Sequence, residues 1–282
     1  MKSERTLREE MIRFSHLCYE RHLLVAMDGN LSCVLPNGDI LCTQAGCHKG
    51  MITDEQLVVI DRQGNKVRGR GNPTSEMAMH LACYQERPDC RAVIHAHPPL
   101  AIAFTIADQS LAQCVLPEVV LTLGTVPTVD YATTGTKGLA DALRPYVRKH
   151  DAVLMDRHGA VALGTSLLDA FCKLETLEHT AKITATARSL GGIKTLPPAE
   201  AVALRSMGLK RYGGPPSAVA LADSPGADLP QACLVCDGCS DPSHQGLAAA
   251  SGISAVRVKG PGMDEVRQVV MEEVLAALKA GA

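Results

Sequence analysis

The chain has 282 residues, 46% of them hydrophobic, and its 28 Lys and Arg nearly balance its 30 Asp and Glu, for a net charge of −2. This balance excludes the strongly basic composition of proteins that bind nucleic acid or membrane surfaces. No apolar run reaches about 18 residues and the N-terminus is charged, so we expect neither a membrane span nor a signal peptide, and therefore a cytoplasmic protein. Its eleven cysteines then indicate reduced thiols or metal ligands rather than a disulfide framework.

The first part of the chain predicts one helix followed by short strands. Apolar residues recur at helical spacing over residues 3–22, which indicates an amphipathic helix packed on one face. Asp28-Gly29-Asn30 is a turn signal. Strands and a hairpin turn are then expected at Ile40–Thr43, Gln56–Asp61, Gly64-Asn65 and Lys66–Arg70. Lys49 lies in the loop between the first two strands and is expected to be solvated.

The stretch from Pro73 to Pro98 carries the chemistry. Thr74 or Ser75 is a natural N-cap for the apolar-periodic helix that follows, because a hydroxyl there can accept from free amides of the first turn. The stretch ends in a short buried strand that contains His95 and His97. Alternation along a strand places both imidazoles on one face, where they can bind one metal ion. The competing interpretation is two hydrogen-bonded core histidines.

A third histidine further along the chain supports the metal interpretation. His158-Gly159 is a tight break between two apolar strand-like runs, and a histidine at such a break can point out of the sheet edge. Three histidines with one open position are the usual arrangement of a catalytic zinc site. Glu76 is then the nearby carboxylate, either a fourth ligand or a general acid/base. The sequence therefore predicts a metal site at His95, His97 and His158.

The remaining elements up to residue 212 are shorter strands and longer helices. Leu116–Leu121 and Thr125–Asp130 have the composition of short strands. Helical patterns cover Thr136–Lys149 and Ser166–Leu190, the longest pattern in the chain.

The composition changes at Gly213. Residues 213–262 are rich in Gly and Pro and include Cys233, Cys236 and Cys239, with His244 nearby. These four side chains have metal-ligand spacing, and unligated thiols are the alternative interpretation. Residues 263–282 form a separate C-terminal segment in which Met263–Lys279 is predicted to be an amphipathic helix.

Seven short motifs, in this order along the chain, resemble those of the class II aldolase/adducin family, of which the L-fuculose-1-phosphate aldolases are the best-known enzymes. They are Gly29-Asn30-Leu31-Ser32, Thr43-Gln44-Ala45-Gly46, Pro73-Thr74-Ser75-Glu76, His95-Ala96-His97-Pro98, Leu116-Pro117-Glu118, His158-Gly159 and Leu177-Glu178-His179-Thr180-Ala181-Lys182. The resemblance covers about residues 5 to 212. It implies an α/β fold of three layers, with a mainly antiparallel central sheet covered by helices, and a catalytic domain over residues 1–212.

The resemblance also implies roles for individual residues. Glu76 would move the substrate proton, and Tyr212 would reach the active site of a neighbouring subunit as a proton donor. The substrate phosphate would be bound by Gly29, Asn30, Gly46, Thr74 and Ser75. The chain departs from the family where Ala45 replaces a phosphate-binding hydroxyl and where Leu121 replaces a substrate-contacting tyrosine.

The implied activity is zinc-dependent cleavage of a ketose 1-phosphate, such as L-fuculose 1-phosphate, to dihydroxyacetone phosphate and an aldehyde such as lactaldehyde. The implied assembly is a homotetramer with active sites between subunits. A pentulose-phosphate epimerase or a methylthioribulose-phosphate dehydratase of the same superfamily is an alternative, although the epimerases usually carry Asp where Glu76 stands. The non-enzyme alternative is an adducin-like interaction domain, and adducin-type members lack the three metal histidines.

The C-terminal segment resembles the encapsulation peptides of bacterial microcompartments, in which a linker leads to a short terminal helix. The resemblance implies that residues 263–279 bind a shell protein or a cargo enzyme, which would place the protein inside a microcompartment. The competing expectation is that this helix packs on the enzyme itself.

Overall fold

A computed structural model describes residues 2–213 of the chain. Eight strands form one sheet in the order β4-β3-β2-β1-β5-β8-β7-β6. All neighbouring strands are antiparallel except the parallel pair β6 and β7. The strands are β1 (Asn30–Val34), β2 (Ile40–Thr43), β3 (Leu57–Ile60), β4 (Lys66–Arg68), β5 (Ala92–Ala96), β6 (Thr128–Val129), β7 (Ala152–Met155) and β8 (Gly159–Gly164). The expected α/β fold with a mainly antiparallel sheet is confirmed.

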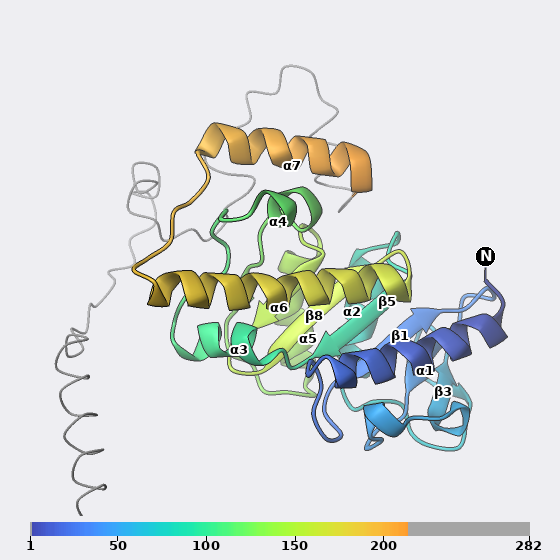
Figure 1. Ribbon diagram of the computed structural model, residues 1–282. Helices are drawn as coiled ribbons and strands as arrows, with labels where there is room; N and C mark the ends of the chain where they lie inside the picture. The colour runs from blue at the N-terminus through green and yellow to red at the C-terminus, as the bar shows by residue number, and fades with distance from the viewer. Residues whose placement is uncertain (1, 214–282) are drawn as a thin grey trace, which may run out of the picture. The chain divides into compact units, whose positions relative to one another are not determined.

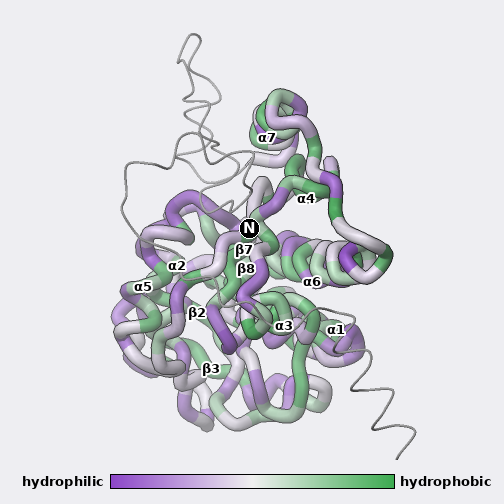
Figure 2. Tube along the Cα trace, turned by 90° about the vertical axis from the view of Figure 1, so that its left-hand side faces the viewer, coloured by the Kyte–Doolittle hydropathy of each residue, from purple (hydrophilic) through white to green (hydrophobic). Residues whose placement is uncertain are grey.

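Helices cover both faces of this sheet. One face carries α1 (Glu4–Glu20), α3 (Pro99–Ile106) and α6 (Leu167–Ser189). The opposite face carries α2 (Met77–Glu86) and α5 (Lys137–Val147). Figure 1 shows α1 and α6 in front of the sheet, and Figure 2 shows the two helical layers on either side of it. The three expected layers are therefore present, and two short 3-10 helices, η1 (Lys49–Met51) and η2 (Asp54–Gln56), join β2 to β3.

Local sequence signals explain where the long helices begin. The side chain of Ser3 accepts a hydrogen bond from the amide of Thr6 at the start of α1, and Thr136 and Ser166 cap α5 and α6 in the same way. Each sheet face then buries its own aliphatic cluster, with few aromatic rings among its members. Packing of these apolar faces fixes the helices on the sheet.

Two expectations about local structure were wrong. The N-cap of α2 is Glu76 rather than Thr74 or Ser75, and its carboxylate makes no capping hydrogen bond. Thr74 instead accepts from the backbone amide of Glu76 across a tight turn. The expected strand Leu116–Leu121 is helical from Pro117 onwards, in α4 (Pro117–Thr122), and Leu116 is the N-cap of that helix. Pro117 at the first helical position has a backbone angle preset for a helix. Packing of α4 against α7 (Pro198–Tyr212) and α6 then outweighs the strand preference of the valines.

The last described helix, α7, packs against α4. Helix α4 in turn contacts α6. Within residues 2–213, no helix is long and apolar enough to cross a bilayer. The predicted linker after Gly213, the Cys233/Cys236/Cys239/His244 group and the predicted helix at 263–279 lie outside the described residues.

Candidate active site

Three histidines converge where strands β5 and β7 end and strand β8 begins. His95 belongs to β5, His97 follows it, and His158 lies in the turn between β7 and β8. Because β5 pairs with β8, and β8 with β7, the sheet brings this turn beside the end of β5. One ring nitrogen from each histidine lies within 4.8 Å of the others. The structure thus places the three predicted ligands together.

The hydrogen bonds of these rings suit a metal ion. Nδ1 of His95 lies 2.9 Å from the carbonyl oxygen of Ala160, so this nitrogen carries the proton and donates, which leaves a lone pair on Nε2. That Nε2 lies only 3.1 Å from Nε2 of His97. On the other side of His97, Nδ1 lies 3.6 Å from a carboxylate oxygen of Asp28. Imidazole nitrogens oriented in this way are typical ligands of a divalent transition metal, and the residues present fit such an ion.

Glu76 faces the histidines from the start of α2. Its Oε2 lies 3.1 Å from Nε2 of His95 and accepts a hydrogen bond of 2.9 Å from the amide nitrogen of Asn30. Its Oε1 lies 3.2 Å from Nε2 of His158, yet has no aligned hydrogen-bond partner within residues 2–213. The side chain is 11% exposed. A nearly buried carboxylate with one free oxygen is thus available beside the histidines.

Charge and burial set the protonation states here. Burial by itself would raise the pKa of Glu76, but its contacts with His158, His95 and Asn30 outweigh burial and hold that pKa well below its ordinary range. Burial lowers the pKa of His97 to about 4, and repulsion from His95 and His158 adds to this effect. The site therefore presents a carboxylate and a neutral His97 near pH 7, the states that metal binding and base catalysis require.

Two glycines allow these segments to approach closely. A Cβ atom on Gly159 would lie 2.5 Å from the carbonyl oxygen of Ala96 and about 3 Å from the rings of His95 and His97. Gly29 has a φ of +65°, and its Cβ would lie 2.7 Å from the carbonyl oxygen of His95. Only glycine fits both positions without displacing the backbone.

The segments that carry the predicted phosphate-binding residues also meet. The amide of Ala45 donates to the carbonyl of Asn72, which joins the Gly46 turn to the segment that holds Thr74 and Ser75. Thr74 is buried, whereas Ser75 and Gly46 are exposed. Thr43 accepts from the amide of Leu31 and so joins the same region to the Gly29–Asn30 turn. The side chain of Asn30 is engaged by Glu76 and His80, so its phosphate-binding role stays a prediction.

Tyr212 is the last residue of α7, and its side chain is 57% exposed. Its ring contacts the guanidinium of Arg211, 5.3 Å from the ring centroid. Since α7 packs chiefly on α4, the structure does not bring Tyr212 to the histidines of its own subunit.

The sequence-based prediction for Lys49 was wrong. Its side chain is buried, and its ammonium donates to the carbonyl oxygens of Met27, at 2.7 Å, and Cys47, at 2.9 Å. Burial lowers its pKa, although Asp28 and Glu76 act in the opposite direction. Lys49 thus connects the loop before Gly29 to the loop after Gly46. No local sequence pattern signals this contact, since it depends on two loops that meet only in the fold.

His80 was also missed. It is fully buried on α2 and lies between Ser32 and Asn30 of β1. A signal was available in the sequence: Glu76, His80 and Tyr84 recur every four residues, which makes a polar stripe on an otherwise apolar helix.

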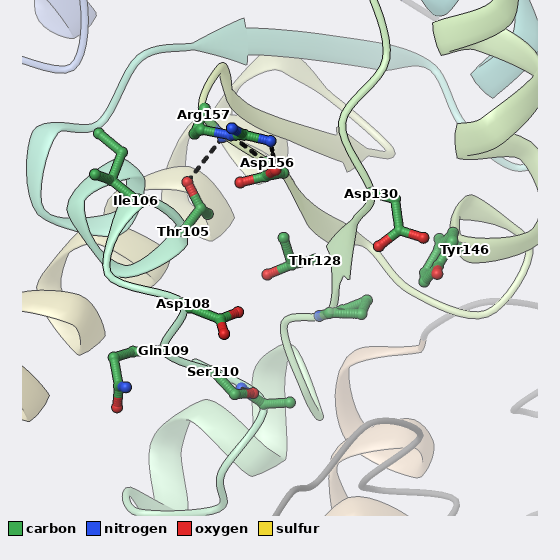
Figure 3. Close-up of a pocket in the computed structure, with 12 residues that line it drawn as sticks. Thr105, Ile106, Asp108, Gln109, Ser110, Thr128, Asp130, Tyr146, Asp156 and Arg157 are labelled. Atoms are coloured by element: carbon green, nitrogen blue, oxygen red, sulfur yellow. Dashed lines mark hydrogen bonds and ion pairs between the residues drawn. The ribbon is translucent and has the colours of Figure 1, made fainter. Parts of the chain in front are cut away.

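A separate cavity of about 670 Å³ lies beyond the turn that carries His158. Figure 3 shows Asp108, Asp130 and Asp156 around it, together with Arg157, which pairs with Asp156 and donates its backbone amide to Thr105. Within the described part of the chain, the histidine group is the cluster with metal-ligand spacing, and these three aspartates are not part of it. None of the described residues that line this cavity belongs to the histidine group.

Comparison with known proteins agrees with this geometry. Residues 9–185 match the family described as Class II Aldolase and Adducin N-terminal domain. The chain therefore belongs to the class II aldolase/adducin family.

Relatives within the family have more than one activity. The chain is 34% identical over 186 residues to the 3-oxo-tetronate 4-phosphate decarboxylase of Escherichia coli (strain K12), which covers 64% of this chain and 87% of the relative. It is 34% identical over 175 residues to the L-fuculose phosphate aldolase of Methanococcus vannielii, which covers 62% and 93%. These relatives mark the chain as similar to enzymes that act on phosphorylated sugars or sugar acids.

Solved structures confirm the fold. YgbL from Klebsiella pneumoniae superposes with a TM-score of 0.69 at 32% identity, over 73% of this chain and all of that one. An L-fuculose 1-phosphate aldolase superposes with a TM-score of 0.67 at 32% identity, over 73% of this chain and 96% of the other.

Proposed function

We propose that this chain is a zinc-dependent aldolase that cleaves a ketose 1-phosphate of the L-fuculose 1-phosphate type into dihydroxyacetone phosphate and an aldehyde such as lactaldehyde. The observation that carries the proposal is the contact of the Glu76 carboxylate with two of three converging imidazoles. A base beside a metal site is what cleavage next to a carbonyl group requires.

His95, His97 and His158 are proposed as the zinc ligands. The bound ion would act as a Lewis acid towards the carbonyl and hydroxyl oxygens of the substrate. Asp28 would orient His97 through Nδ1, as the carbonyl of Ala160 orients His95. Burial and repulsion from His95 and His158 lower the pKa of His97 to about 4, so this proposed ligand is neutral near pH 7.

Glu76 is proposed to move the proton at the carbon beside the substrate carbonyl. During cleavage this carbon retains the electron pair of the broken bond and needs a proton. The Glu76 carboxylate would take the proton released by the substrate hydroxyl that becomes the aldehyde oxygen, and would return it to this carbon. The hydrogen bond from Asn30 leaves Oε1 of Glu76 free to exchange that proton. Stabilising the negative charge that develops at this carbon lowers the barrier because the charge is absent from the ground-state substrate.

The phosphate is proposed to bind where the Gly29–Asn30 turn, the Gly46 turn and the Thr74–Ser75 segment meet. Backbone amides and hydroxyls bind phosphate well at the start of a helix. The buried ammonium of Lys49 adds a positive charge close to this region. Tyr212 is proposed to serve the active site of a neighbouring subunit in a homotetramer, at the oxygen of the departing aldehyde.

Decarboxylation of a 3-oxo sugar-acid phosphate is a second candidate reaction, favoured by the 34% identity to the E. coli decarboxylase. Both reactions break a bond to the carbon beside a carbonyl and leave the electron pair there. Loss of carbon dioxide from a 3-oxo-tetronate 4-phosphate also gives dihydroxyacetone phosphate. The two reactions therefore share the same three-carbon product and differ in the departing group.

The test is an assay of the zinc-loaded full chain against a panel of ketose 1-phosphates and a 3-oxo-tetronate 4-phosphate. Dihydroxyacetone phosphate is measured together with released aldehyde and carbon dioxide. We expect equal amounts of dihydroxyacetone phosphate and aldehyde from the ketose 1-phosphate. Carbon dioxide without aldehyde would establish the decarboxylase, and turnover that persists after zinc is chelated would overturn the metal mechanism.

Residues 263–279 are proposed to bind a shell protein or a cargo enzyme of a bacterial microcompartment. The support is the sequence alone: a Gly/Pro-rich segment followed by a short predicted helix, whose apolar stripe would contain Val266, Val270, Val274 and Leu278. A helix of this length needs an apolar partner surface to be stable.

A further inference from the structure

A stripe of polar side chains crosses the buried interface between α2 and β1. His80 and Tyr84 are four residues apart on α2, and Glu76, the N-cap of α2, precedes His80 by four residues, so the three side chains follow one face of the helix. Asn30 and Ser32 are two residues apart on β1, so they lie on one face of the sheet. The polar stripe of the helix lies directly against Asn30 and Ser32. Apart from Glu76, all of these side chains belong to residues exposed by 5% or less.

These five side chains form one continuous chain of hydrogen bonds. The hydroxyl of Tyr84 lies 2.7 Å from Oγ of Ser32, which lies 2.6 Å from Nδ1 of His80. Nε2 of His80 lies 2.5 Å from Oδ1 of Asn30, and Nδ2 of Asn30 lies 2.9 Å from Oε2 of Glu76. The path alternates between helix and strand and ends at the carboxylate that faces the histidines.

The chemistry of the carboxylate fixes the direction of every bond in this path. An ionised Glu76 can only accept, so Asn30 must turn its amide nitrogen towards it. The carbonyl oxygen of Asn30 then faces His80, which must donate from Nε2. In a neutral imidazole the other nitrogen, Nδ1, is an acceptor, so Ser32 must donate to it. The hydroxyl proton of Ser32 is then used, and its oxygen accepts from Tyr84.

The burial of His80 supports this assignment. The residue is completely excluded from solvent, and burial lowers its pKa to about 3, with repulsion from His95 adding to the effect. A protonated imidazole would donate from both nitrogens and would compete with the Ser32 hydroxyl. The neutral form with a proton on Nε2 lets every hydrogen bond in the chain form in one direction.

We propose that His80 is a positioning residue for the reaction, which acts through Asn30 to aim the Glu76 carboxylate at the metal site. Tyr84 and Ser32 hold His80 in the required tautomer. The direction of the hydrogen bonds is therefore set from Tyr84, about two helical turns away from Glu76. The proposal rests on the proposed role of Glu76 as the base. It also explains why a polar stripe is retained in an interface that is otherwise apolar.

Substitution of His80 separates positioning from packing. His80→Gln can donate to Asn30 and accept from Ser32, so it keeps the polarity of the chain. His80→Met has a similar volume but leaves both partners unpaired. In the zinc-loaded full chain we expect His80→Met to lose roughly 10- to 100-fold in kcat, with KM and zinc content unchanged. We expect His80→Gln to recover most of that loss. Met79→Leu, a volume-conserving change at the neighbouring buried position, is the control for disturbance of α2.

Nitrogen-15 NMR of histidine-labelled protein tests the polarity without any substrate. The His80 resonances are identified by their absence from the His80→Gln spectrum. We expect the tautomer with its proton on Nε2 in the native chain, and a mixture of tautomers in Ser32→Ala, which removes the donor to Nδ1. If the protein turns over none of the substrates, the proposed function is refuted. The NMR measurement would still decide the direction of the hydrogen bonds between Tyr84 and Glu76. A proton on Nδ1 of His80, or equal kcat values for His80→Met and His80→Gln, would overturn the inference.

Discussion

Asn30 of β1 and His95 of β5 are direct partners in their antiparallel strand pair. Partners in such a pair point to the same face of the sheet, so the β1–β5 register places the amide that holds Glu76 beside a proposed metal ligand. A slip of one residue would turn one of the two side chains to the opposite face. One ladder of backbone hydrogen bonds therefore aligns the Asn30–Glu76 contact with the three histidines.

His97→Ala is expected to abolish both zinc binding and turnover. Its side chain is 22% exposed and lies outside the strand core, so its removal should leave the thermal midpoint of the zinc-free protein nearly unchanged. Zinc content is measured by mass spectrometry on the purified protein, alongside the cleavage assay. His179→Ala, an exposed histidine on α6, is the matched control and should keep both properties. Full zinc content in the His97 variant would remove this residue from the ligand set.

Glu76→Gln tests whether the carboxylate is a base or a ligand. The amide has the same shape but cannot accept a proton from the substrate, so we expect a loss of roughly 10²–10⁴-fold in kcat. The three imidazoles should still bind zinc nearly normally. If zinc content and rate instead fall together, Glu76 acts chiefly as a metal ligand, and the proton must be moved by another group.

The grouping of the three histidines was predictable from the sequence because its signals are local. His95 and His97 alternate along one short strand, and a histidine followed by glycine marks the turn between two others. The hydrogen-bond chain that ends at Glu76 was predictable only in part. His80 lies one helical turn after Glu76, but the partners of His80 on β1 are about 50 residues away in sequence. Only the pairing of α2 with β1 reveals that they meet.

Lys49 and α4 show where local reasoning fails. A lysine in a polar loop is ordinarily solvated, yet two loops close over Lys49 and supply carbonyl acceptors. The valines of α4 favour a strand by propensity, but α7 and α6 offer it a packing surface. In both cases the deciding contacts come from segments distant in sequence.

Acid should destabilise this fold through His80. Its pKa is about 3 in the native state and 6.5 for a free side chain, so below pH 6.5 the unfolded chain binds a proton that the native chain excludes. The free energy of unfolding should therefore decrease as pH falls from 6.5 towards 3, by about 1.4 kcal/mol per pH unit from this residue. Denaturant titrations at several pH values should show a smaller slope in His80→Gln. Identical slopes in both proteins would mean that His80 does not titrate in this way.

Truncation after Gly213 tests the role proposed for the C-terminal segment. If residues 263–279 serve targeting, the truncated enzyme should keep its activity, thermal midpoint and oligomeric state. A fluorescent protein fused to residues 255–282 should then co-purify with microcompartment shells, and Val270→Asp in the apolar stripe should abolish this. An unstable or dissociated truncated enzyme, with a fusion that stays diffuse, would assign the segment to the enzyme itself.

Lys49→Met tests whether the buried ammonium holds the phosphate-binding loops. The substitution keeps most of the aliphatic volume but leaves the carbonyl oxygens of Met27 and Cys47 without their donor, which should cost about 1–3 kcal/mol of stability. Because these loops lead into the Gly29 and Gly46 turns, we expect KM for the phosphorylated substrate to rise roughly tenfold, equivalent to about 1.4 kcal/mol of binding, with little change in kcat. Lys137→Met, at an exposed position, is the matched control. A variant that loses stability while its KM stays unchanged would limit Lys49 to a structural role.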